Sequence, residues 1–182
     1  MNPKLVWFSV VAVIGVVLDQ ITKAWIRANI EYRDAGITVI DGFFDIVHAQ
    51  NPGAALGLLG NVPGRRYLFV VFTLVAGGVI INMLRQLKPA ERFLPVVLGL
   101  ILSGAIGNAI DRIINEGGRV TDFLRFHTEG APGLREWLAT HWPYMTEYPS
   151  FNVADINLVV GVLLFIVYYL FLEEKPEQAA EK

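Results

Sequence analysis

Four long apolar segments constrain the fold of this chain more than any other feature. They are residues Leu5–Ile26, Tyr67–Leu84, Phe93–Ile114 and Val153–Leu172. A helix needs about 20 mostly apolar residues to cross roughly 30 Å of hydrocarbon. The 182 residues are 54% hydrophobic, whereas soluble domains are about 45–50% apolar. We therefore expect an all-α membrane protein with four transmembrane helices, forming a single membrane-embedded domain over residues 1–182.

The first apolar segment is predicted to be a retained span and not a cleaved signal peptide. Its apolar stretch is longer than the roughly 7–15 residues of a signal-peptide core. A small-residue cleavage site does not follow it, because Asp19, Gln20 and Lys23 come next.

Two long connections, 27–66 and 115–152, are predicted to lie on one side of the membrane. Four spans place both termini and the short turn Arg85–Arg92 on the other side. Lysine and arginine residues are frequent on both sides. The positive-inside rule therefore does not orient the chain by itself.

The first long connection predicts a small β element. Ile37–Ile40 and Phe43–Ala49 are rich in β-branched and aromatic residues, and Asp41-Gly42 between them is a hairpin turn signal. The second connection predicts a short interfacial helix near Leu134–Thr140. Aromatic residues, which favour the headgroup region, surround that segment: Trp137, Trp142, Tyr144 and Tyr148.

Three carboxylates lie inside the predicted spans: Asp19, Asp111 and Asp155. A charged group at the centre of a membrane helix costs at least about 2.5 kcal/mol, so such residues are candidates for function. Spans one and three run in the same direction and span four runs back. All three carboxylates are therefore expected at the membrane face that carries both long connections.

Two of these carboxylates also have structural interpretations. Asp19 and Lys23 are four residues apart in the order that favours an ion pair on one helix face. Asp111 belongs to a polar cluster beside small residues that permit close helix packing, and such clusters commonly orient active groups. The polar residues are Asn108, Asp111 and Arg112, and the small residues on the same face are Gly104 and Gly107.

Asp155 has no cation within one helical turn, and its alternative role is to favour the positive end of a helix dipole. Its candidate partner is Asp122, which lies in the apolar run Val120–Phe123. Desolvation raises the pKa of a carboxyl group, and two such groups brought together share one proton. This pair would supply the acid and the base for peptide hydrolysis. Sequence reasoning alone does not bring the two residues together.

The sequence gives little support to other catalytic or binding chemistries. The chain has no cysteine, which excludes disulfides and thiolate catalysis. His48, His127 and His141 lack the spacing of a zinc motif, and no nucleophile elbow is present. No basic stripe indicates nucleic-acid binding. We expect no metal and no cofactor.

Five motifs in this chain resemble those of the lipoprotein signal peptidase (signal peptidase II) family in order and spacing. The resemblance covers spans one, three and four and both long connections. The motifs are Asp19-Gln20-x-x-Lys23, Asn51-x-Gly53-Ala54-Ala55, Gly107-Asn108-x-x-Asp111-Arg112, Val120-x-Asp122-Phe123 and Phe151-Asn152-x-Ala154-Asp155.

The resemblance implies an aspartic endopeptidase with Asp122 and Asp155 as its catalytic dyad. It implies substrates that are prolipoproteins carrying diacylglyceryl on a cysteine, cut just before that cysteine, and inhibition by globomycin-type cyclic peptides. It also implies a bacterial inner-membrane protein in contact with membrane lipids, with cytoplasmic termini and a site toward the periplasm. The residues implied to line or support the site are Asp19, Lys23, Asn51, Gly53, Ala54, Asn108, Asp111, Arg112, Asn152 and Ala154.

Leu124–Ser150 is longer than is usual in the family, and either a lid over the substrate or a foot on the membrane surface would account for it. Two functional alternatives stay open at this stage. One is a small transporter or channel component in which Asp19, Asp111 and Asp155 form an ion path. The other is a non-catalytic assembly factor that uses its loops for docking.

Overall fold

A computed structural model describes residues 2–53, 64–146 and 148–172, and the structural statements below refer to these. Ala54, one of the expected supporting residues, lies outside them. The described chain contains four helices long and apolar enough to cross a membrane, which confirms the predicted class. They are α1 (Pro3–Asn29), α2 (Arg65–Gln86), α3 (Phe93–Ile114) and α5 (Val153–Val167), the last continued by a π-helical turn at Tyr168–Leu172.

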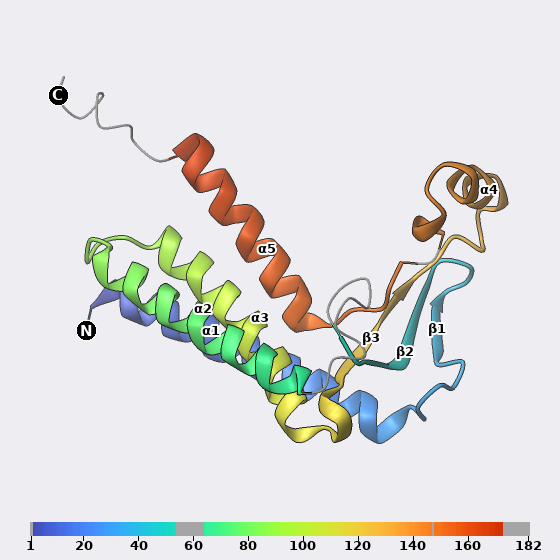
Figure 1. The fold of residues 1–182 in the computed structure, drawn as a ribbon. Coiled ribbons are helices and arrows are strands. Elements are labelled where there is room, and N and C mark those ends of the chain that lie inside the picture. Colours follow the sequence, from blue (N-terminus) through green and yellow to red (C-terminus); the bar gives the residue numbers. More distant parts are fainter. Residues whose placement is uncertain (1, 54–63, 147, 173–182) are drawn as a thin grey trace.

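Figure 1 shows α1, α2 and α3 lying alongside one another while α5 crosses them at an angle. We call the end of the bundle that carries both long connections the loop end, and the opposite end the turn end. Lys4 is buried at the turn end. Its Nζ donates to the carbonyl oxygens of Arg85 (3.1 Å) and Leu87 (2.5 Å). This lysine thereby satisfies carbonyl groups that the end of α2 leaves unpaired.

Helix α3 is central, because it packs against α1, α2 and α5. Small residues along α3 allow this close approach. A Cβ atom added at Gly107 would lie 2.5 Å from a carboxylate oxygen of Asp19 and 3.0 Å from the Cβ atom of Ala154. Helices α1, α3 and α5 therefore converge at the loop end on a glycine that has no room for a side chain.

The first prediction concerns this glycine. Gly107→Ala should lower the thermal stability of the detergent-solubilised protein, because overpacking a filled contact costs about 1–3 kcal/mol. Gly78→Ala is the matched control, since an added Cβ atom there meets nothing within 4 Å. The control should be neutral or slightly stabilising. Equal melting temperatures for the two variants would contradict the close packing.

The three strands form one antiparallel sheet in the order β1-β2-β3, with bounds Ile37–Ile40, Phe44–Asn51 and Val120–Phe126. The β1–β2 hairpin confirms the predicted β element, and Gly42 adopts the positive φ of 70° that its turn requires. Strand β3 was not predicted. It pairs with β2 across some 70 residues of sequence, with Ala49 opposite Asp122.

The second long connection leaves the sheet after β3 and returns to it at Phe151, which bridges to Leu124. Between these points lie α4 (Pro132–His141) and a 3-10 turn, η3 (Pro143–Met145). The predicted helix near Leu134–Thr140 is therefore present. Figure 1 shows α4 at the far end of the sheet, away from the helical bundle.

Candidate active site

Asp122 lies in the middle of β3 and is almost fully buried, with 3% of its surface exposed. The strand pairing places it at the loop end, where the sheet meets the helices. Its carboxylate accepts a hydrogen bond from Asn152 Nδ2 at 2.6 Å. The side chain of Asn51, at the end of β2, also hydrogen bonds to it. Gly53 in turn donates its backbone N–H to Asn51 Oδ1 at 3.0 Å.

Asp155 is held by the start of α5. Asn152 and Asp155 form a capping box, in which each side chain accepts from the backbone N–H of the other residue (3.0 and 3.1 Å). Asn108 Nδ2 of α3 donates to the other carboxylate oxygen at 2.8 Å. Asp155 therefore stabilises the start of α5, as its alternative role predicted, and the same hydrogen bonds fix the direction of its carboxylate.

Asn152 joins the two carboxylates. Its side chain donates to Asp122 while its backbone N–H donates to Asp155. Asn108 closes the arrangement, because its Oδ1 accepts from Asn152 Nδ2 at 3.2 Å and its Nδ2 donates to Asp155. The structure thus brings Asp122 and Asp155, 33 positions apart in sequence, onto one hydrogen-bonded unit.

Burial, together with the nearby charge of Asp155, raises the pKa of Asp122 to about 7. The hydrogen bonds from Asn51 and Asn152 oppose this shift without cancelling it. Two carboxyl groups that interact in this way titrate as a unit.

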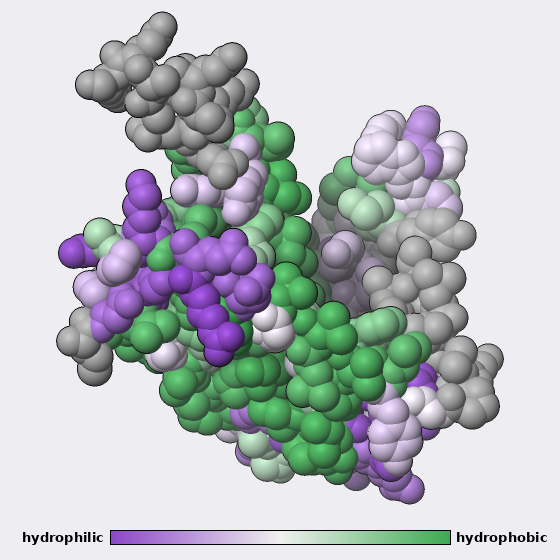
Figure 2. Space-filling model, turned by 60° about the vertical axis from the view of Figure 1, so that its left-hand side comes forward, coloured by the Kyte–Doolittle hydropathy of each residue, from purple (hydrophilic) through white to green (hydrophobic). Residues whose placement is uncertain are grey.

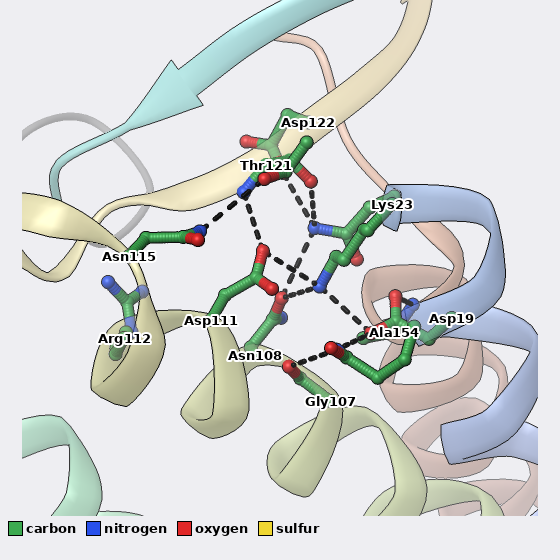
Figure 3. Close-up of polar contacts among 12 residues, drawn as sticks. Asp19, Lys23, Gly107, Asn108, Asp111, Arg112, Asn115, Thr121, Asp122 and Ala154 are labelled. Carbon is green, nitrogen blue, oxygen red and sulfur yellow. Dashed lines mark hydrogen bonds and ion pairs between the residues drawn. The ribbon is translucent and has the colours of Figure 1, made fainter. Parts of the chain in front are cut away.

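A buried charge network of Asp19, Lys23 and Asp111 lies beside Asp122 and Asn108 (Figure 3). Lys23 Nζ is 2.9 Å from Asp19 and 3.5 Å from Asp111, and all three side chains are fully buried. The predicted Asp19–Lys23 pair is therefore formed. Arg27 adds a second cation 3.3 Å from Asp111.

This network positions the residues next to the two carboxylates. Lys23 donates to Asn108 Oδ1 at 3.0 Å, which directs the Asn108 amide nitrogen toward Asp155. Asp19 accepts from the backbone N–H of Ala154 at 2.9 Å. Asp111 accepts from the backbone N–H of Thr121 at 2.7 Å. Thr121, next to Asp122, and Ala154, next to Asp155, are thereby each hydrogen-bonded to a buried carboxylate of the network.

Arg112 occupies a different place from the other supporting candidates. Its guanidinium lies 3.9 Å from the centre of the Phe69 ring and donates to the carbonyl oxygen of Gly118 at 3.4 Å. These contacts join α2, α3 and the turn that follows α3. In this arrangement Arg112 stabilises the loop end, and its positive charge is close enough to Asp122 and Asp155 to act on both carboxylates.

Sequence reasoning missed Arg27, Gln20 and Thr121. Arg27 was assigned to the first long connection, whereas α1 continues to Asn29. Extending the four-residue spacing from Asp19 through Lys23 would have reached Arg27 on the same helix face. Gln20 donates to Asp19 (3.0 Å) and to the carbonyl oxygen of Gly107 (3.1 Å); it belongs to the Asp19-Gln20-x-x-Lys23 motif, which was the signal for this role.

A cavity of about 470 Å³ lies beside this network, and neither carboxylate of the pair lines it. Its walls are Arg27, Gln50, Asn115, Glu116, Gly117 and Arg119. Within the described ranges, no group of three His, Cys, Asp or Glu side chains is arranged to hold a metal ion.

The second prediction tests the role of Asp19. Asp19→Asn keeps an oxygen that accepts from Ala154 but loses the ion pair with Lys23. Mutating such a supporting partner commonly costs about 10–100-fold in activity, so measurable activity should remain. Complete loss in a well-folded variant would instead place Asp19 in the chemistry.

The fold and the site together define a membrane protein with two linked carboxylates, Asp122 buried and Asp155 half-buried, at one end of a four-helix bundle. It shares this fold with solved bacterial membrane enzymes. One has a TM-score of 0.72 and 27% identity, covering 91% of this chain and 94% of that one. A second has a TM-score of 0.70 and 28% identity, covering 92% of both chains.

The sequence comparisons are more specific. The family model described as "Signal peptidase (SPase) II" matches residues 11–171. The lipoprotein signal peptidase of Symbiobacterium thermophilum is 39% identical over 91% of this chain and 95% of that protein. That of Geobacter metallireducens is 38% identical over 90% of both. The chain belongs to the signal peptidase II family, as its motifs predicted, and is therefore a membrane protease.

Proposed function

We propose that this chain removes signal peptides from diacylglyceryl-modified prolipoproteins by cutting just before the lipidated cysteine. In this proposal it is an aspartic endopeptidase whose catalytic residues are Asp122 and Asp155. The observation that carries the proposal is the pair of carboxylates joined through Asn152 and Asn108. No metal or covalent nucleophile is needed in such a mechanism.

The pair provides an acid and a base at once. The ionised carboxylate takes a proton from water as the water oxygen attacks the scissile carbonyl carbon, and the protonated carboxyl donates to the carbonyl oxygen. The tetrahedral intermediate then collapses, the C–N bond breaks, and the leaving amine receives a proton from the pair. Asn108 and Asn152 keep the two carboxyl groups oriented during these transfers.

The depth of the pair suits a lipidated substrate. Asp155 lies in the first turn of α5, at the loop end of the membrane-spanning helices. A substrate whose acyl chains stay in the bilayer presents its scissile bond near that interface. We place the loop end toward the periplasm and both termini in the cytoplasm of the inner membrane. Globomycin-type cyclic peptides would then compete for the same site.

An ion path through Asp19 and Asp111 is not favoured. Both carboxylates are held by the cations Lys23 and Arg27, so neither is free to bind a passing ion. All of these groups lie at the loop end of α1 and α3. A path across the membrane would also need free polar groups at the turn end, where the buried Lys4 is held by the carbonyl oxygens of Arg85 and Leu87.

The deciding experiment compares two precursors that differ only in lipidation, each incubated with the purified protein in detergent. We expect cleavage of the diacylated precursor just before its modified cysteine and little cleavage of the unlipidated one. Equal cleavage of both would reject the substrate class. Cleavage of neither by a folded protein would reject the peptidase proposal.

The third prediction concerns pH. The mechanism needs one protonated carboxyl group, and the pKa of Asp122 is raised to about 7. As the pH rises through this value the pair loses its shared proton, so kcat/KM should fall above about pH 7. A pH–rate profile for the lipidated precursor checks this. A rate that keeps rising toward pH 9 would contradict a shared proton.

A further inference from the structure

The α4 arm, which we define as residues 128–146 and 148, takes no part in the site described above. Its base is fixed to the sheet, because Tyr148 donates its backbone N–H to the carbonyl oxygen of Phe126 at 3.0 Å and Gly130 donates its own to that of Gly42, in the β1–β2 turn, at 2.7 Å. Helix α4 itself packs chiefly against η3 among the described elements. The arm is therefore held at its base while its outer helix has a free surface.

That free surface is amphipathic. Leu134 and Trp137 lie on one face of α4 and are about half exposed, at 50% and 49%. Trp142 continues this face, at 60% exposed, with its indole ring 6.0 Å from that of Trp137. The remaining sides of the helix are polar and carry Arg135, Glu136 and Thr140, while His141 stacks on the Trp137 ring with 4.8 Å between the ring centres. Two adjacent exposed indoles beside a leucine make an apolar patch of the kind that marks an interaction surface.

The position of the arm indicates what covers this patch. Figure 1 shows the sheet leading from the loop ends of the helices out to one side, with α4 at its far end. Figure 2 shows a recess between α5 and the lobe that contains α4. The arm thus lies beside the bundle, on the side toward α5, at the end where the helices leave the membrane.

We propose that the α4 arm docks on the interface of the same bilayer that the four helices span, with Leu134, Trp137 and Trp142 at headgroup depth. Tryptophan favours this depth, and helices with Trp and Leu on one face and charged residues on the other lie in the interface plane. The arm has one arginine, Arg135, against Glu129 and Glu136, so it carries no excess of positive charge. Docking therefore depends on apolar and aromatic insertion and not on anionic lipid.

Docking would support the sheet at both ends. Near the bundle, β3 is attached to Asp111 through Thr121. At its far end β3 leads through Phe126 to the arm. A docked arm holds β3, which carries Asp122, at a fixed height above the membrane. The consequence for catalysis rests on the proposed function, but the docking itself does not.

The test uses single-tryptophan proteins in phosphatidylcholine vesicles. The chain has four tryptophans, Trp7, Trp25, Trp137 and Trp142, and three are replaced by phenylalanine in each protein. Trp25 is 49% exposed near the loop end of α1 and calibrates interface depth. Brominated lipids should quench Trp137 and Trp25 to within about twofold of each other, most strongly with shallow bromines. Added anionic lipid should not change this.

Two results would contradict the docking proposal. If aqueous iodide quenches Trp137 while brominated lipid does not, the arm lies in water and the docking proposal is wrong. Quenching by lipid only after a lipopeptide is added would also overturn it, and would identify the arm as a lid. Trp25 reports whether each protein is correctly inserted.

A functional comparison separates docking from the peptidase proposal. The variant W137S/W142S should raise KM for a lipidated precursor severalfold in vesicles, with little change of kcat and little effect in detergent. E136S, on the polar face of α4, is the matched control and should behave as the parent protein. An unchanged KM in vesicles would overturn the supporting role of the arm. Lipid quenching of Trp137 in a protein without peptidase activity would uphold docking and reject the proposed function alone.

Discussion

Asp122→Asn and Asp155→Asn are each expected to lower the rate of cleavage of a lipidated precursor by roughly 10²–10⁴-fold, the usual contribution of a general acid or base. Asparagine has nearly the same shape as aspartate, and its Oδ1 still accepts from Asn152 Nδ2 at position 122 and from Asn108 Nδ2 at position 155. The amide neither takes a proton from water nor donates an acidic one. The pair then lacks either its base or its acid.

Several controls make this result specific. The double variant should lose little more than either single one, because residues that act as a unit are not additive. Asp45→Asn is the matched control. Asp45 is a buried carboxylate of the same sheet, and its hydrogen bonds with Arg125, the shorter of them 2.6 Å, keep the pKa of that carboxyl below its usual range. That variant should keep cleaving. Substantial cleavage by either dyad variant would reject the mechanism.

The largest effect on stability is expected from Lys23→Met. Lys23 is the cation shared by Asp19 and Asp111, and all three side chains are fully buried. Removing one partner of a buried ion pair typically costs about 3–5 kcal/mol, because a charge is left uncompensated. Asn108 also loses its donor. Thermal unfolding in detergent should therefore shift strongly downward, and activity should fall with it.

Lys88→Met is the control for removing a lysine, because Lys88 is exposed in the turn between α2 and α3. Adding Asp19→Asn to Lys23→Met should recover part of the lost stability, since it removes one of the unpaired charges. If Lys23→Met unfolds at the same temperature as the parent protein, the network contributes little. If the double variant is less stable than Lys23→Met alone, uncompensated charge is not the cause.

The local sequence was sufficient to predict most of the helical fold. Length and apolar composition located four spans, and the limits of α3 agree with the prediction at both ends. The error at α1 was its end, because Arg27 is charged and was assigned to the loop. Its guanidinium reaches Asp111, so its charge is neutralised within the helix. A hydropathy scale counts the charge of Arg27 but takes no account of the Asp111 carboxylate that neutralises it.

The sequence by itself determined that this is a four-span membrane protein with several carboxylates at one face, and the spacing of Asp19 and Lys23 already specified their pairing. Only the tertiary structure decided that Asp122 belongs to a strand and that Asn152 and Asn108 join it to Asp155. The physical reason is the range of the interactions. Helix formation and i, i+4 pairs depend on neighbours within a turn, whereas β3 gains its hydrogen bonds from β2, far away in the chain.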